Sequence, residues 1–159
     1  MYPEVIVNPM KAELTSVGFA DLTSPEDVQN AIKSGETVLM VVNSVCGCAA
    51  GACRPGVKQS LANQKKPAKL TTVFAGFDID AVAEARKHFA PYPPSSPSIA
   101  LFKNGELVHF VERHNIEGRN AAAISEHLKA VYDEYLYRLD AIIKRTIPGI
   151  NRKIIIFIV

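Results

Sequence analysis

The chain has 159 residues, of which 48% are hydrophobic and 21% are charged, and its formal net charge is +2. This balance predicts one globular domain with a sizeable core, and it excludes the strong basic or acidic excess of chains that bind nucleic acids or acidic partners. No apolar run approaches the roughly 20 residues of a membrane-spanning helix, and the N-terminus lacks the pattern of a secretory signal. Three cysteines also form no disulfide framework, so we expect a cytoplasmic protein without nucleic-acid or membrane partners.

Residues 1–36 predict two helices that precede the first long strand. Asn8 and Pro9 supply an N-cap and a first-turn proline for the first helix. The second helix has the stronger start signal, because Ser24-Pro25-Glu26-Asp27 places two acids in its first turn. A glycine ends each helix.

Residues 37–42 are an apolar, mostly β-branched run without alternation. Such a run predicts a strand that is covered on both faces, as in the middle of a parallel sheet. The small residues after Cys48 favour a helix, so Cys46 and Cys48 lie where a buried strand ends and a helix begins. That helix should run to about Gln64, with a kink near Gly51–Pro55 because proline removes an amide donor.

The remaining elements are a strand, a helix, a hairpin and a closing helix. Residues 70–77 predict the strand and 78–89 the helix, whose inward residues are Ile79, Val82, Ala83 and Phe89. A proline-rich loop over 91–98 leads to the hairpin, whose turn is Asn104-Gly105. The closing helix should begin around Gly118 or Arg119, with an apolar face of Ala121, Ile124, Leu128, Val131 and Tyr135.

This element order predicts an α/β fold. Two strand–helix units that feed an antiparallel hairpin give a central mixed four-stranded sheet with helices on both faces, a three-layer sandwich of thioredoxin-like type. We assign residues 1–137 to this single domain with its helical lead-in. Residues 138–159 form an extension of unknown role: an edge strand, an oligomer contact and a loosely packed tail are all open.

The two close cysteines carry the predicted chemistry. A helix N-terminus favours an anion, so a thiolate is stabilised there and its pKa falls. Two inert buried thiols are the alternative, but cysteines on both sides of Gly47 favour a thiol-exchange site. If they join, Gly47 relieves the crowding in a small ring, and the strained disulfide is readily reduced. Cys46, nearer the strand, is the predicted nucleophile, and Cys48 is the predicted resolving thiol.

Cys53 and Arg54 each have two interpretations. An intact helix would place Cys53 too far from Cys48 for a disulfide, which favours a packed thiol. The alternative is a module in which Cys46, Cys48 and Cys53 bind a soft metal or an iron–sulfur cluster, although their spacing is not that of a zinc ribbon. We expect no metal site. Arg54 either raises the local positive potential or is simply solvated on the helix surface.

The loop residues Ser96 and Pro97 complete the predicted site. In thioredoxin-like folds a cis-proline precedes the third strand and faces the cysteine turn, and Pro97 stands in that place. The backbone before it would pair with an incoming thiol compound. We predict substrate-binding roles for Asn43, Ser44, Gly47, Ser96 and Pro97.

The histidines give a weaker signal. His109 and His127 are predicted to be structural or solvated. His114 follows the hairpin and is either a surface residue or a proton carrier for the cysteines.

Several motifs are similar to those of the bacilliredoxin family over roughly residues 4–136. They are Val41-Val42-Asn43-Ser44-Val45-Cys46-Gly47-Cys48-Ala49-Ala50-Gly51, Arg54-Pro55, Pro94-Ser95-Ser96-Pro97-Ser98, Val108-His109-Phe110, Arg113-His114, Leu14-Thr15 and Gly18-Phe19. The resemblance implies a cytoplasmic thiol–disulfide oxidoreductase that removes bacillithiol from mixed disulfides on client proteins, with weak disulfide isomerase activity. It implies that Cys46 attacks and takes up the bacillithiol and that Cys48 has a resolving or modulating role, with bacillithiol or another low-molecular-weight thiol as co-substrate and no cofactor. Cys53 and the tail after Leu136 lie outside this pattern.

Overall fold

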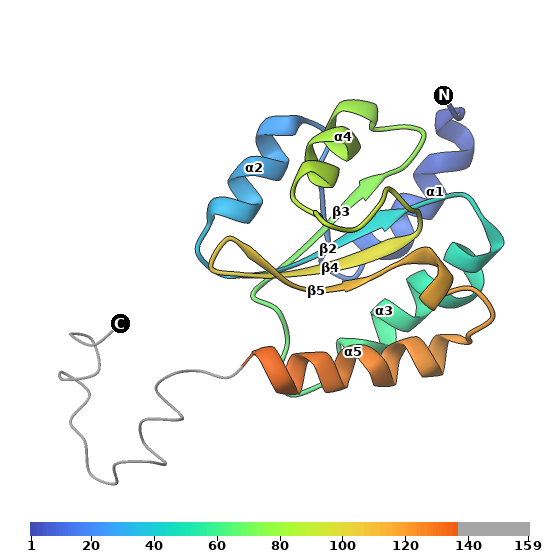
Figure 1. Ribbon diagram of the computed structural model, residues 1–159. Helices are drawn as coiled ribbons and strands as arrows, with labels where there is room; N and C mark the ends of the chain where they lie inside the picture. The colour runs from blue at the N-terminus through green and yellow to red at the C-terminus, as the bar shows by residue number, and fades with distance from the viewer. Residues whose placement is uncertain (137–159) are drawn as a thin grey trace, which may run out of the picture.

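The computed structural model describes residues 1–136 and has the predicted three layers (Figure 1). Its strands are β1 (Ala20–Asp21), β2 (Thr37–Asn43), β3 (Lys69–Phe74), β4 (Ser98–Lys103) and β5 (Glu106–Val111). Its helices are α1 (Glu4–Thr15), α2 (Pro25–Lys33), α3 (Arg54–Ser60), α4 (Ile79–Lys87) and α5 (Ala121–Tyr135), with a π-helical turn at Ala49–Cys53 and a 3₁₀ turn at Arg113–Asn115. The predicted extension, 138–159, lies outside the described residues.

The sheet is mixed, and β2 is its central strand. The strand order is β1-β3-β2-β4-β5, with β2 parallel to β3 and antiparallel to β4. The sheet has five strands where four were predicted, because β1 also pairs with β3. β1 is only two residues long and exposed, so it leaves no apolar run in the sequence.

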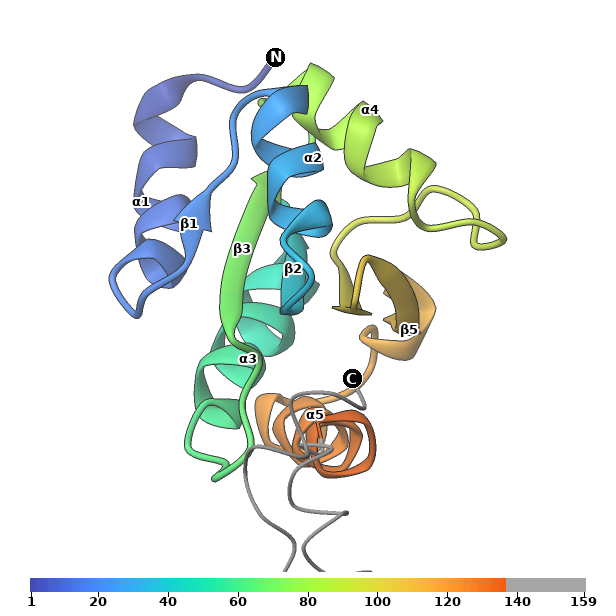
Figure 2. The ribbon, with the colours of Figure 1, turned by 90° about the vertical axis from the view of Figure 1, so that its left-hand side faces the viewer.

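Helices cover both faces of the sheet, and α1 lies beside its β1 edge (Figures 1 and 2). Val38, Met40 and Val42 of β2 belong to the core under α2 and α4. Leu39 and Val41 belong to the core under α3 and α5. The continuous apolar run of β2 therefore has the predicted cause, burial on both faces.

The helix starts agree with the sequence only in part. The capping box of α2 is confirmed: the Ser24 hydroxyl accepts the Asp27 amide at 3.2 Å, and the Asp27 carboxylate accepts the Ser24 amide at 3.1 Å. The predicted start of α1 is wrong, because the helix begins at Glu4 and contains Pro9. A proline there deprives only the carbonyl of the exposed Val5 of its helical donor, which water can replace.

Two further helices differ in detail from the prediction. In α4 the residues Ala81, Val82 and Ala85 are buried, whereas Ala83 is exposed and Ile79, at the first position of the helix, is 51% exposed. In α5 the start is Ala121, later than predicted. The carboxamide oxygen of the N-cap residue Asn120 accepts the amide of Ala123 at 2.9 Å, and this cap fixes the start.

The predicted hairpin is confirmed, and the region of the predicted kink is π-helical. Asn104 and Gly105 join β4 to β5 with φ of 53° and 79°. A π-helical turn spans Ala49–Cys53 and continues directly into α3, with Pro55 in the first turn of α3.

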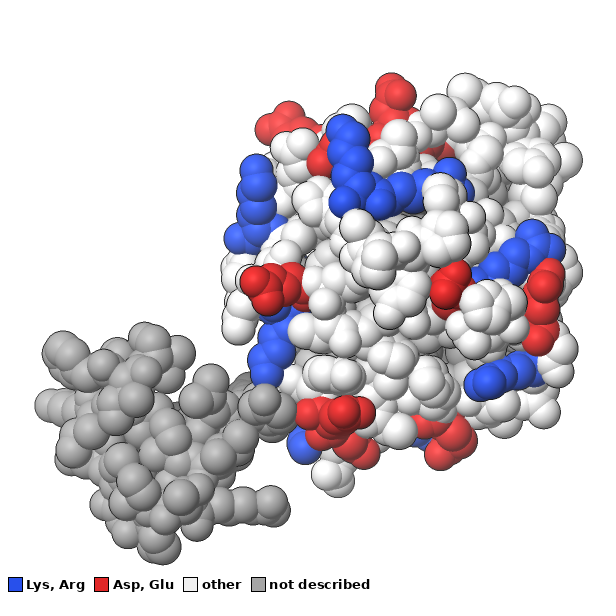
Figure 3. Space-filling model, in the orientation of Figure 1, with Lys and Arg blue, Asp and Glu red and all other residues white. Residues whose placement is uncertain are grey.

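Two properties of residues 1–136 bear on the predicted partners: the distribution of charge on the surface and the length and polarity of the helices. Figure 3 shows lysine and arginine interspersed with aspartate and glutamate on one face of the molecule. No helix in this part of the chain is long and apolar enough to cross a membrane.

Candidate active site at the cysteine turn

The turn that follows β2 holds Cys46 and Cys48, which are joined in a disulfide with Cα atoms 5.4 Å apart. The π-helical turn begins directly after Cys48. Two donors point at the sulfur of Cys46: the hydroxyl of Ser44 at 3.2 Å and the backbone amide of Ala49 at 3.4 Å. The same donors would stabilise a thiolate at this position, because hydrogen bonds to the charged form favour it.

Arg54 lies under this turn and is only 1% exposed, so the prediction that it is solvated on the helix surface is wrong. One of its terminal nitrogens, Nη1, donates to the side-chain oxygen of Asn43 at 3.1 Å and to the carbonyl of Ser44 at 2.9 Å. Its Nε donates to the carboxylate of Glu13 on α1 at 2.7 Å. These partners compensate the cost of burying the guanidinium.

The contacts of Arg54 continue to the reactive sulfur. The side-chain oxygen of Asn43 also accepts the backbone amide of Ser44 at 2.8 Å, while its amide group donates to the carbonyl of Met10 at 3.2 Å. Arg54 therefore holds Asn43 and Ser44, and Ser44 contacts Cys46. The sequence gives no local signal for this positioning role, although Arg54-Pro55 is one of the motifs similar to those of the family.

Cys53 is fully buried in the core between the sheet and helices α3 and α5. Burial raises the pKa of its thiol to about 12, against the opposing effect of the neighbouring Arg54 charge. Cys53 is thus the packed thiol that was predicted, and it stays protonated at neutral pH. Residues 1–136 contain no group of three histidine, cysteine or acidic side chains that could hold a metal ion.

A pocket of about 250 Å³ opens beside Cys46. It brings together segments far apart in the sequence, and its lining residues are Tyr2, Ser44, Val45, Cys46, Ala75, Gly76, Arg86, Ser96 and Arg113. The peptide bond between Ser96 and Pro97 is cis, as predicted, and a second cis bond joins Ala90 to Pro91.

The other predicted binding residues, Asn43, Gly47 and Pro97, do not line this pocket, and Pro97 is buried. Asn43 is fully buried, and its polar atoms contact Arg54, Ser44 and Met10. Gly47 is exposed on the turn.

The side chain of His114 is 69% exposed and lies 3.9 Å from the carboxylate of Glu112, so it faces solvent rather than the pocket.

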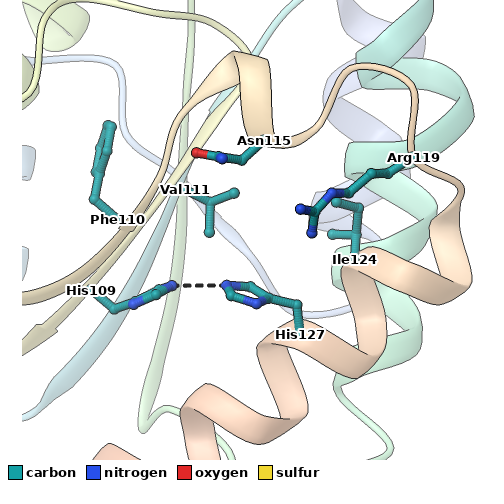
Figure 4. A pocket seen from close by; sticks show the side chains of 7 residues that line it. All are labelled: His109, Phe110, Val111, Asn115, Arg119, Ile124 and His127. Carbon is teal, nitrogen blue, oxygen red and sulfur yellow. Dashed lines mark hydrogen bonds between the residues drawn. The ribbon is translucent and has the colours of Figure 1, made fainter.

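A second pocket, also of about 250 Å³, is built around a pair of histidines (Figure 4). The Nε2 atoms of His109 on β5 and His127 on α5 lie 2.9 Å apart. Burial lowers the pKa of both rings. The charge of a protonated His127 lowers the pKa of His109 further, against a smaller opposite effect of Glu134. Arg119 lowers the pKa of His127 in the same way. Sequence analysis predicted structural or solvated histidines but not their contact.

We expect this pair to make the fold sensitive to mild acid. Both pKa values are lower in the folded protein than the ordinary 6.5, so the unfolded chain binds more protons as the pH falls below that value. The free energy of unfolding, measured by urea titration, should therefore fall between about pH 7.5 and about pH 5. His127→Gln should reduce this dependence, with His114→Gln as control. An unchanged slope in His127→Gln would contradict the assignment.

Known proteins of one family are similar to this chain over almost all of its described residues. The family described as disulphide isomerase matches residues 2–136. A bacilliredoxin from Cytophaga hutchinsonii is 62% identical over 134 residues, which cover 84% of this chain and 99% of the relative. A bacilliredoxin from Halalkalibacterium halodurans is 50% identical over 135 residues, which cover 84% of this chain and 94% of the relative.

Solved structures share the fold at low sequence identity. Oxidised mitochondrial thioredoxin 3 from Saccharomyces cerevisiae matches with a TM-score of 0.52 and 16% identity, over 77% of this chain and 98% of that one. Oxidised thioredoxin from Plasmodium falciparum matches with a TM-score of 0.52 and 19% identity, over 76% of this chain and 100% of that one. The fold is therefore that of thioredoxin.

Proposed function

Because the chain belongs to the bacilliredoxin family and is a thiol–disulfide oxidoreductase, we propose that it removes bacillithiol, or a similar low-molecular-weight thiol, from mixed disulfides on client proteins. One observation carries the proposal: the sulfur of Cys46 has two hydrogen-bond donors and lines a pocket together with Ser96. Such a sulfur is both stabilised as a thiolate and open to a small thiol compound.

In the first step the thiolate of Cys46 attacks the sulfur of the small thiol in the mixed disulfide. The bond between that sulfur and the client breaks, and the client leaves as a thiolate that takes a proton from water. A disulfide between Cys46 and the small thiol remains. Ser96, whose peptide bond to Pro97 is cis, would receive the small thiol beside the turn, and the hydroxyl of Ser44 would donate to the sulfur of Cys46 throughout.

In the second step Cys48 attacks Cys46 and releases the small thiol as a thiolate. The product is the disulfide of the structure. The two cysteines have then supplied two electrons to the mixed disulfide, whose halves leave as the client thiol and the small thiol, so two equivalents of a low-molecular-weight thiol must reduce the turn before the next cycle. The proposal needs no cofactor beyond that thiol, and we propose the cytoplasm as its compartment, where thiols are kept reduced.

Disulfide isomerase activity is a second proposed activity of the same site. The matching family carries that description, and isomerisation needs only attack and release by a thiolate such as that of Cys46. It differs from thiol removal because it requires no net electron transfer to the client.

The test uses the reduced protein with a client that carries one bacillithiol mixed disulfide. Intact mass should show the loss of bacillithiol from the client and a bacillithiol adduct on Cys46 in a Cys48→Ser background. Glutathione on the same client and a protein with scrambled disulfides are the comparison substrates. Release of bacillithiol without an adduct on Cys46 would refute the mechanism. Faster repair of scrambled disulfides than removal of bacillithiol would make isomerisation the main activity.

A further inference from the structure

The pocket beside Cys46 contains two guanidinium groups that the proposed chemistry does not use. Arg86 comes from α4 and Arg113 from the 3₁₀ turn after β5. No aspartate or glutamate lines the pocket. The walls of the pocket therefore carry two positive charges close to the reactive sulfur, and the carboxylate that pairs with Arg113, that of Glu117, lies outside the lining.

Arg86 has an unused donor. Its Nε is buried, and no hydrogen-bond partner for it exists within residues 1–136. Buried polar groups in folded proteins are nearly always paired, and an exception calls for an explanation such as an absent ligand. Because this nitrogen is closed to solvent, a carboxylate in the pocket would bind through the terminal N–H groups of Arg86, which lines the pocket.

Arg113 is held at the mouth of the same pocket. Its Nη1 donates to the carbonyl of Ser96 at 3.3 Å, and its Nε lies 2.6 Å from the carboxylate of Glu117. Both side chains of this ion pair are about half exposed, 45% and 50%, so water screens their attraction. The guanidinium thus keeps further N–H groups for a ligand beside Ser96.

We propose that Arg86 and Arg113 form a carboxylate subsite, which selects anionic low-molecular-weight thiols for exchange at Cys46. Planar guanidinium groups bind carboxylates through paired hydrogen bonds, and they do so better where water is partly excluded. The inference rests on the proposed function and deepens it, because it specifies the charge of the thiol and the residues that recognise it.

The experiment measures attack of the Cys46 thiolate on three symmetric disulfides that differ in charge. They are 3,3′-dithiodipropionate, which is anionic, 2-hydroxyethyl disulfide, which is neutral, and cystamine, which is cationic. In each reaction one half of the probe joins Cys46 and the other half leaves as a thiolate. A Cys48→Ser background keeps the adduct, and intact mass after acid quenching gives its rate of formation.

The ratio of the anionic rate to the neutral rate reports the subsite. We expect Arg86→Gln and Arg113→Gln each to lower this ratio about tenfold, as expected for the loss of a charge-assisted contact. Raised salt should lower it as well. The neutral probe corrects for any change in the pKa of Cys46, since that change affects all three probes. Lys87→Gln removes one charge from the same helix, outside the pocket, and should keep the ratio.

Each outcome decides one of the two claims. If the neutral disulfide reacts but the ratio is unchanged in both arginine variants, the subsite is refuted while thiol exchange stands. A change that Lys87→Gln reproduces would also refute it, because net charge alone would then explain the preference. If the neutral disulfide forms no adduct on Cys46 in the Cys48→Ser protein that retains both arginines, the exchange function itself fails.

Discussion

Replacing Cys46 by serine is expected to lower the rate of mixed-disulfide removal by at least about a thousandfold, because the attacking sulfur is lost. Cys48→Ser should leave the first step intact, since the two donors to the sulfur of Cys46 come from Ser44 and Ala49. The measurement is the release of the free client thiol, followed together with intact mass. Cys48→Ser should accumulate the small thiol on Cys46.

The third cysteine provides the matched control. Cys53 is buried with a pKa of about 12, so Cys53→Ala should keep the exchange rate within about twofold while losing about 1 kcal/mol of stability to a small cavity. Full activity in Cys46→Ser with loss in Cys48→Ser would reverse the two roles. Loss of exchange in a folded Cys53→Ala protein would show that the third sulfur takes part.

Arg54→Met is expected to lower the free energy of unfolding by about 3 kcal/mol, near the lower end for breaking a buried charged network. The variant removes the donor that Asn43 and the carbonyl of Ser44 share. Glu13 is 40% exposed on its side chain, so water can solvate the carboxylate left behind. Urea unfolding of the reduced protein, followed by circular dichroism, gives the value.

Two controls separate the positioning role of Arg54 from bulk stability. Glu13→Gln should cost about 1 kcal/mol or less, because its partner charge is partly solvated. In Arg54→Met the pH profile of Cys46 alkylation should move to higher pH, because Ser44 no longer holds its hydroxyl at the sulfur. Arg54→Lys should restore part of this shift. An unmoved profile would limit Arg54 to a structural role.

The fold was predictable because its signals are local. The run at 37–42 with apolar residues on both sides, the Ser24 capping box and the Asn104-Gly105 turn each specify an element within a few residues. β1 was not predictable, because two exposed residues become a strand only through their pairing with β3. The predicted start of α1 was wrong because the rule that places proline in the first turn of a helix does not hold for Pro9, which lies inside the helix.

The residues of the site likewise fall into two groups: those predictable from local motifs and those that depend on contacts between distant segments. The positions of Cys46 and Cys48 and the cis bond before Pro97 follow from motifs that are continuous in the sequence. The role of Arg54 depends on Glu13, 41 residues away on another helix. Arg86 and Arg113 reach the pocket from two further elements. Long-range contacts of this kind arise from packing, and a sequence pattern shows only that an arginine is present.

The burial of Cys53 protects the protein against non-native disulfides. Within eight positions the chain carries two cysteines that form a disulfide and a third whose thiol is buried in the core beneath α5. As long as α3 and α5 stay together, Cys53 is the one cysteine of the three that oxidants do not reach, and it cannot form a disulfide with Cys46 or Cys48. Separation of those helices would expose a third thiol to disulfide exchange, so the lifetime of the redox turn depends on the contact between α3 and α5.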